Sequence, residues 1–227
     1  VGASALGANT TGATNTAVGS QALASTTTGD ENTGVGRDAL YNNTTGEECT
    51  AVGISAGYLN TTGDNNLFLG RRAGYTGSPG GEITTASNEV CIGNGSISAA
   101  NIQVDWTIAS DKRDKTDVSP MDLGLEFINQ LEPVTYRWDK RSKYSDDQSS
   151  IPDGTHKEEQ LEGGFLAQDV EVLEEQYGHK QSDKTNLTFS LSSDEKMYGI
   201  KYGKFVPMLV KAVQELSAEV EELKSKL

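Results

Sequence analysis

The sequence predicts a mainly β repeat stalk, followed by a small α+β domain that ends in a long coiled-coil helix. Three observations support this fold class. The chain repeats every 17 residues at its start, all 13 lysines lie beyond residue 110, and the last 22 residues carry a valine and leucine heptad. We therefore expect a stalk over residues 1–109, shaped as a trimeric β-helix or β-roll, and a second domain over 110–227 with the coiled-coil helix at 206–227.

The 17-residue period is set by pairs of an apolar residue and a glycine. Such pairs begin at residues 1, 18, 35, 52 and 69. A sixth pair, Ile92-Gly93, follows after 23 residues, so an insertion of six around residues 78–81 interrupts the fifth repeat. Thr-Thr-Gly triplets and single alanines keep the same phase. Such self-similarity indicates a repeat array; a flexible low-complexity linker, the alternative, does not hold phase.

Each repeat has the composition of a short strand followed by turns. The apolar stretches 16–18 and 66–69 are followed by Gly, Asn and Thr, without a helical period. One or two apolar residues in 17 give a single chain too little core. We therefore expect the repeats to stack along an axis and identical chains to wrap around it. The pattern resembles the repeats of trimeric phage fibres and the heads of trimeric bacterial adhesins.

Composition excludes several classes of function. The net charge of -14 without a basic stripe argues against nucleic acid and against anionic membrane surfaces. No apolar run approaches the roughly 20 residues that span a bilayer, and no signal peptide is visible. The start at Val1 rather than Met indicates a fragment of a longer protein. Cys49 and Cys91 are expected to be buried free thiols rather than a disulfide. His156 and His179 have no second ligand nearby in sequence, so we expect no metal site and no cofactor.

The second domain reads as alternating helices, strands and polar excursions. Ser119-Pro120 predicts a capped helix start. In order we expect a helix to 131, a strand at 134–138, an exposed excursion at 140–162, a strand at 164–167, an amphipathic helix at 168–177, a second excursion at 178–195 and a strand at 198–202.

The last helix carries apolar residues alternately three and four positions apart, with its glutamates outside this seam. The seam consists of Val206, Leu209, Val213, Leu216, Val220, Leu223 and Leu227. Two interpretations remain open, a helix packed on its own domain and a parallel coiled coil. Valine at one seam position and leucine at the other would by themselves favour two strands, so a trimer must be argued from the rest of the molecule.

The string SDKRDK at residues 110–115 lies at the boundary between the two modules. A serine hydroxyl attacks only if a base takes its proton, and with no histidine close in sequence a neutral lysine is the candidate. Burial favours neutral lysine whereas carboxylates oppose it, so the two aspartates are unfavourable unless Arg113 neutralises them or neighbouring chains bury Lys115. Lys112 is the reserve candidate. Five residues turn about 140° around an α-helix, so we expect Ser110 and Lys115 on a loop or bend.

Four motifs in the second domain occur together and in order. They are Ser110-Asp111-x-Arg113-x-Lys115, Leu131-Glu132-Pro133-Val134 followed by Tyr136 and Trp138, the segment 164–170 (GFLAQDV) and the segment 202–216 (YGKFVPMLVKAVQEL). The set resembles the intramolecular chaperone domain at the C-terminus of phage tailspikes and tail fibres, also classed as the S74 peptidase family. That domain recurs in a membrane-bound animal transcription factor of myelin-forming cells. Each motif alone is weak, but the set spans nearly the whole domain.

The resemblance implies a function. In that family three chains assemble through this domain, the fibre folds above it, and the domain then cuts itself off. The family's serine and lysine correspond to Ser110 and Lys115, with Asp111 and Arg113 in support and the cut between Ala109 and Ser110. It implies a homotrimeric tail fibre or tailspike of a virion, assembled in the host cytoplasm, with single-turnover autoproteolysis and no cofactor.

Other functions remain open beside this one. A host cell-surface receptor is a further partner, through the stalk or the region upstream. The alternative function is a non-cleaving structural or adhesive trimer, whose C-terminal domain stays attached as a receptor-binding tip. A hydrolase acting on host glycans is less well supported, because no paired carboxylates stand in a persuasive setting.

Overall fold

The computed structural model describes residues 1–145 and 148–227 and divides into two compact units. The first unit comprises Val1–Ile97, Arg137–Glu162 and Leu191–Gly199, and the second comprises Ser98–Tyr136, Gly163–Ser190 and Ile200–Leu227. Most of the excursion predicted at 140–162, and the end of the one predicted at 178–195, thus belong to the same unit as the repeats. Residues 146–147 of the first excursion lie outside the described residues. Within the described chain, no helix has the length and apolar character needed to cross a bilayer.

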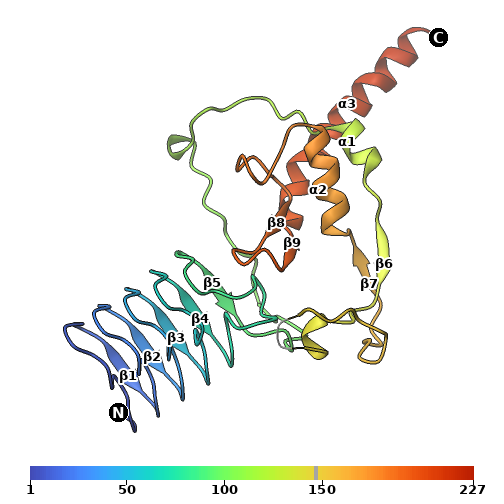
Figure 1. Cartoon of the computed structure of the whole chain (residues 1–227). Coiled ribbons are helices and arrows are strands. Elements are labelled where there is room, and N and C mark those ends of the chain that lie inside the picture. The colour runs from blue at the N-terminus through green and yellow to red at the C-terminus, as the bar shows by residue number, and fades with distance from the viewer. Residues whose placement is uncertain (146–147) are drawn as a thin grey trace. The chain divides into compact units, whose positions relative to one another are not determined.

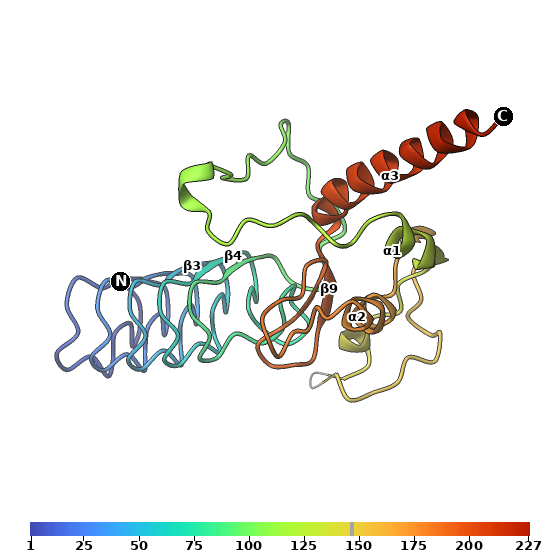
Figure 2. The ribbon, with the colours of Figure 1, turned by 90° about the horizontal axis from the view of Figure 1, so that it is seen from above.

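The repeats form a β-solenoid, as the fold class predicted. Each strand pairs in parallel with the next, in the order β1 (Thr16–Val18), β2 (Thr33–Val35), β3 (Thr50–Val52), β4 (Leu67–Leu69) and β5 (Val90–Ile92) (Figure 1). Val18 pairs with Val35, one 17-residue repeat later, while Leu69 pairs with Ile92 across 23 residues. This register confirms the phase and the six-residue insertion. Successive coils follow one another along a single axis (Figure 2).

One chain closes a narrow solenoid core by itself, although its apolar content predicted dependence on neighbours. Leu23 and Leu40 occupy the same repeat position in left-handed backbone, with φ of 53° and 52°, and are fully buried. The equivalent positions in the next turns are Gly57 and Gly74. A Cβ at Gly57 would lie 2.7 Å from Cδ2 of Phe68, and one at Gly74 would lie 2.4 Å from its Cε1. The phenylalanine therefore fills the volume that leucines fill elsewhere.

Asparagines and cysteines complete the solenoid interior. Asn32 is fully buried; its Nδ2 donates to the Gly46 carbonyl at 2.8 Å and its Oδ1 accepts from the Cys49 N–H at 3.0 Å. Such bonds offset the cost of burying an amide. Cys49 and Cys91 are buried free thiols, as predicted, and burial raises the pKa of Cys49 to about 11. Both are thus poor nucleophiles.

The outer face of the solenoid sheet leaves apolar side chains uncovered in the single chain. Val18, Val52 and Ile92 occupy equivalent positions on β1, β3 and β5 and are 47%, 42% and 53% exposed, with the half-buried Val35 and Leu69 on the strands between them. Exposed apolar rows of this kind are typical of surfaces that associate.

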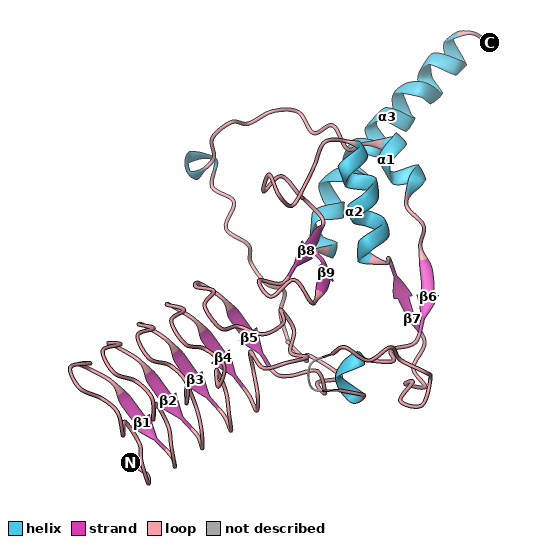
Figure 3. Cartoon of the chain, viewed as in Figure 1, coloured by secondary structure: helices cyan, strands magenta, loops and turns pink. Residues whose placement is uncertain are grey.

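Downstream of the solenoid, the chain forms a small α/β region and a long final helix (Figure 3). The elements are α1 (Leu125–Gln130), β6 (Val134–Tyr136), β7 (Glu162–Gly164), α2 (Ala167–Gln176), β8 (Phe189–Leu191), β9 (Tyr198–Ile200) and α3 (Phe205–Ser225), with 3-10 turns η1 (Lys112–Asp114), η2 (Arg141–Lys143) and η3 (Tyr202–Lys204). β6 pairs with β7 and β8 pairs with β9. Three helices pack around one apolar cluster formed by Leu123, Phe127, Val170, Leu173, Phe205 and Met208. The order follows the prediction, but β8 lies within a segment expected to be a polar excursion.

The start of α1 corrects the sequence prediction. Ser119-Pro120 was expected to cap this helix, but it begins at Leu125 after Gly124, which offers no side-chain cap. Glu215 on α3 supplies the acceptor instead, since its Oε2 takes the Leu125 N–H at 2.7 Å. The cap thus comes from 90 residues away in the sequence.

Candidate active site

The SDKRDK string forms one tight turn between its serine and its lysine. Asp111 caps η1, accepting the Arg113 N–H on Oδ1 at 2.9 Å, and Lys115 leaves the turn in extended backbone. This single turn, isolated in a long loop (Figure 3), brings the lysine back over the serine. Lys115 Nζ lies 2.6 Å from Ser110 Oγ, within reach for a proton transfer.

The charges beside this pair are partly neutralised. Arg113 donates two hydrogen bonds to the Asp111 carboxylate, from Nε to Oδ1 at 3.1 Å and from Nη2 to Oδ2 at 2.6 Å. Hydrogen bonds from Arg113 lower the pKa of Asp111, and Asp111 in turn raises the pKa of Arg113. The arginine therefore offsets the negative charge of one of the two aspartates next to the Ser110 and Lys115 pair.

The segment around the predicted cut is open to solvent. Every residue from 101 to 120 is exposed, so Ala109, Ser110 and Lys115 are all accessible in the single chain. Lys112, the reserve candidate for the base, sits in η1, and the amine on the Ser110 hydroxyl is that of Lys115.

Helix α3 has two apolar faces. One face is buried against the rest of the second unit through Phe205, Met208 and Ala212. Six of the seven predicted seam residues lie elsewhere on the helix, and Leu227 follows its end at Ser225; even the least exposed of the seven, Val220, is 40% exposed. Among the described residues the seam is therefore only partly covered, which favours the coiled-coil interpretation over a heptad packed on its own domain.

Two polar contacts that position the second unit were not predicted. Glu174 is fully buried on α2 and accepts the N–H groups of Leu187 and Thr188 at 2.8 and 2.7 Å. His179 places Nε2 3.1 Å from the Asp122 carboxylate. A glutamate on the apolar side of an amphipathic helix is a sequence signal for the first contact. The second joins residues 57 apart and leaves no sequence signal.

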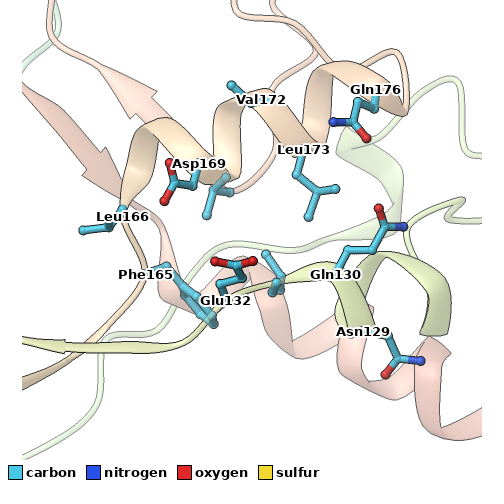
Figure 4. A pocket seen from close by; sticks show the side chains of 11 residues that line it. Asn129, Gln130, Glu132, Phe165, Leu166, Asp169, Val172, Leu173 and Gln176 are labelled. Carbon is cyan, nitrogen blue, oxygen red and sulfur yellow. The ribbon is translucent and has the colours of Figure 1, made fainter.

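A hollow of about 630 Å³ lies in the second unit, lined mainly by α1, α2 and the chain that follows α1 (Figure 4). Leu173 and Phe165 line it together with the carboxylates of Glu132 and Asp169. Neither Ser110 nor Lys115 is among its lining residues. The hollow is therefore separate from the candidate site.

Comparison with known families bears directly on this region. Residues 110–178, from the serine to the glycine after α2, match the family model described as chaperone of endosialidase, Peptidase_S74. No curated protein and no solved structure matches the chain. The match begins at the serine that the structure pairs with Lys115 and includes the α1 and α2 core. The region that follows the β-solenoid stalk in the sequence is thus similar, over residues 110–178, to the chaperone of endosialidase family, peptidase S74.

Proposed function

We propose that this chain is the C-terminal part of a trimeric phage tail fibre or tailspike. In this proposal, residues 110–227 drive trimerisation and folding of the stalk and then release themselves by cutting between Ala109 and Ser110. The observation that carries the proposal is the 2.6 Å contact of Lys115 with Ser110, at the first residue of the S74 family match and directly behind the stalk. The mature product is a virion component, assembled in the host cytoplasm.

The chemistry is an attack on the preceding peptide bond. Ser110 Oγ adds to the carbonyl carbon of Ala109 while Lys115 takes its proton. The C–N bond then breaks, the released nitrogen takes the proton back from Lys115, and the acyl group is left as an ester on Ser110. Water hydrolyses this ester. Nucleophile and target are adjacent in the chain, which lowers the entropic part of the barrier.

Assembly supplies what the single chain lacks. Lys115 must lose its proton to act as a base, and in the single chain it is exposed to water. Docking of neighbouring chains over this loop would penalise the charged amine and favour the neutral one. Cleavage that waits for assembly follows from this, since an unassembled chain keeps its lysine solvated.

Three uncovered apolar surfaces support association of identical chains. The α3 seam is the first and the row on the solenoid sheet is the second. The third precedes the cut, where Ile102, Val104, Trp106 and Ile108 alternate with polar residues and are 52–78% exposed. This alternation is that of a strand with one apolar face, which in the single chain has nothing to cover it.

The number of chains in the assembly does not follow from the seam alone. The seam alone, with valine and leucine alternating, favours two strands. Val210, next to the seam and 52% exposed, widens the apolar stripe beyond a two-stranded seam. Sedimentation equilibrium measures the count directly, and a stable monomer or dimer would refute it.

Cleavage is tested by substitution at the pair. We expect wild-type protein to give fragments of residues 1–109 and 110–227 on a denaturing gel. Ser110→Ala and Lys115→Met should both stay full-length and folded, while Lys112→Met, the matched lysine control in the same turn, should still be cut. Cleavage that persists in Ser110→Ala would assign the cut to another group or to a contaminating protease.

The retained-tip alternative also has an observation in its favour. Segments 137–162 and 191–199, downstream of the cut, share a compact unit with the solenoid. Within that unit, Asp194 Oδ2 accepts the Glu82 N–H at 2.9 Å, and Lys196 lies 3.3 Å from the Glu82 carboxylate. Native gel filtration after cleavage separates the two outcomes: released fragments support the self-discarding chaperone, and co-eluting fragments support the retained tip.

The chaperone role makes its own prediction. Each coil pairs only with the next, so one solenoid propagates locally. The chaperone domain would instead be needed to align separate chains in register, because bringing them together costs entropy and opposes nucleation of the assembled stalk. Residues 1–109 alone should therefore fail to assemble. Uncleaved Ser110→Ala protein should recover trimer after dilution from guanidinium, whereas cleaved fibre should not; equal recovery would remove the chaperone role.

A further inference from the structure

The last strand of the solenoid leaves one edge of its sheet unpaired. On the inner strands, the first and third residues bond to the following coil, as the Val52 carbonyl does with the Gly70 N–H at 2.8 Å. On β5 the groups in these positions belong to Val90 and Ile92. Among the described strands β5 pairs only with β4, and Val90 and Ile92 are 66% and 53% exposed. An open edge of this kind is a template for another strand.

The sequence supplies a segment that fits this edge. Residues 107–109 lie one 17-residue period beyond β5. Thr107 takes the position of the threonine that begins β1, β2 and β3. Ile108 takes the middle position, where Phe68 and Cys91 are buried on the two preceding strands. The strand pattern of the repeat therefore continues up to the proposed cut.

The corner of the repeat formed by the Thr-Thr-Gly triplet does not continue in the same way. Each glycine there makes room for the next coil, since a Cβ on Gly63 would lie 2.1 Å from the Ala86 carbonyl oxygen. Ala86 itself carries a Cβ, which would obstruct a further coil at this corner. Gly93, in contrast, keeps the glycine that follows every strand. The continuation we expect is thus a strand reached by a free loop, rather than a complete coil.

We propose that residues 107–109 pair with β5 as a sixth parallel strand once the chain has been cut after Ala109. The inference rests on the proposed function, because the cut makes these residues the end of the stalk. In the uncut chain every residue from 101 to 120 is exposed. In the sixth strand Ile108 would extend the core beyond Cys91, and Trp106, two positions earlier on the same face, would cover its open end. Side chains that are free for contacts between chains before the cut would then be used on their own stalk.

The residue that follows each strand explains why pairing waits for the cut. It is glycine after all five strands, with φ of 132°, 135°, 136°, 100° and 78° at Gly19, Gly36, Gly53, Gly70 and Gly93. Other residues of this chain with positive φ lie between 51° and 66°. One period after Gly93 this position is Ser110, so a sixth strand in the uncut chain would force the serine into a conformation suited to glycine. The cut removes residue 110 from the stalk and with it this restriction.

Disulfide trapping in the full-length chain tests the pairing. Val90 and Thr107 would face each other in the register that β4 and β5 already follow. Neighbouring strands lie about 5 Å apart, within the reach of a disulfide. Oxidation of the Val90→Cys, Thr107→Cys variant should therefore link the two positions within one chain of cleaved protein, as shown by peptide mass mapping. Gln103→Cys in place of Thr107→Cys is the matched control, exposed on the same segment, and should not link. The native cysteines are buried and burial raises the pKa of each, so they react slowly.

Two variants that lack the nucleophile separate this inference from the proposed cleavage. Ser110→Ala keeps a side chain at the glycine position and should trap the pair slowly. Ser110→Gly lifts the restriction and should trap it at least about tenfold faster, without any cut. Absence of the link in Ser110→Gly would overturn the sixth strand, whether or not wild-type protein cuts itself. Equal trapping in the two variants would overturn the role of residue 110. A disulfide that joins two chains, seen as a band of double mass on a non-reducing gel, would assign the β5 edge to a second copy instead.

Discussion

Placing a charge in the α3 seam is the sharpest test of assembly. Leu216 is 48% exposed in the single chain, so about half of its burial remains to be gained from neighbours. Full burial of a leucine stabilises by about 2 kcal/mol, which leaves about 1 kcal/mol per chain and, in the proposed trimer, about 3 kcal/mol per layer of three leucines. Leu216→Asp forfeits this and adds three carboxylates that must lose water. Since 1.4 kcal/mol is a factor of ten, we expect assembly to weaken at least about 100-fold.

The assay is sedimentation equilibrium over a range of protein concentrations, with circular dichroism to check that the helix persists. Gln214→Asp is the matched control, because it adds the same charge to the exposed side of the same helix but lies outside the heptad. It should leave the oligomer intact. An oligomer whose dissociation is unchanged by Leu216→Asp would refute the reasoning and remove the seam as an interface.

Three further predictions follow from individual contacts. Arg113→Met should slow the proposed self-cleavage, measured by gel over time, because no arginine then offsets the Asp111 charge beside Ser110 and Lys115; an unchanged rate would show that the ion pair does not matter for the cut. Phe68→Ala should lower the free energy of unfolding of the stalk by about 3–5 kcal/mol in urea, since the flanking glycines cannot fill the cavity; a loss below about 1 kcal/mol would contradict the packing. The Leu125 N–H, and then a neighbouring lysine, lower the pKa of Glu215. The stabilisation by this carboxylate is therefore present above the ordinary value of about 4.3 and lost as pH falls through the lower folded value. Glu215→Gln should accordingly destabilise at neutral pH, with the difference shrinking in acid, and a pH-independent difference would contradict the assignment.

The sequence determined the stalk almost completely. Repetition places the same local chemistry at each coil, so the period alone fixes which residues pair, including the 23-residue step to Ile92. The α3 heptad could also be predicted from the sequence, because residues on one face of a helix recur at a fixed spacing. The Ser110 and Lys115 pair was predicted as a loop or bend, and a single 3-10 turn between them accounts for their contact. Whether they act as a dyad stays a prediction.

Features that depend on contacts between residues distant in sequence could be seen only in the tertiary structure. Ser119-Pro120 had a good local signal for a helix start, yet α1 begins at Leu125, because Glu215 supplies its acceptor from another helix. Phe68 compensates for glycines on two different coils, which no single repeat reveals. The two faces of α3 could be separated only once one face was seen buried and the seam exposed. Periodic neighbours can be read from the chain, whereas caps, compensating volumes and the choice of buried face depend on contacts that only folding creates.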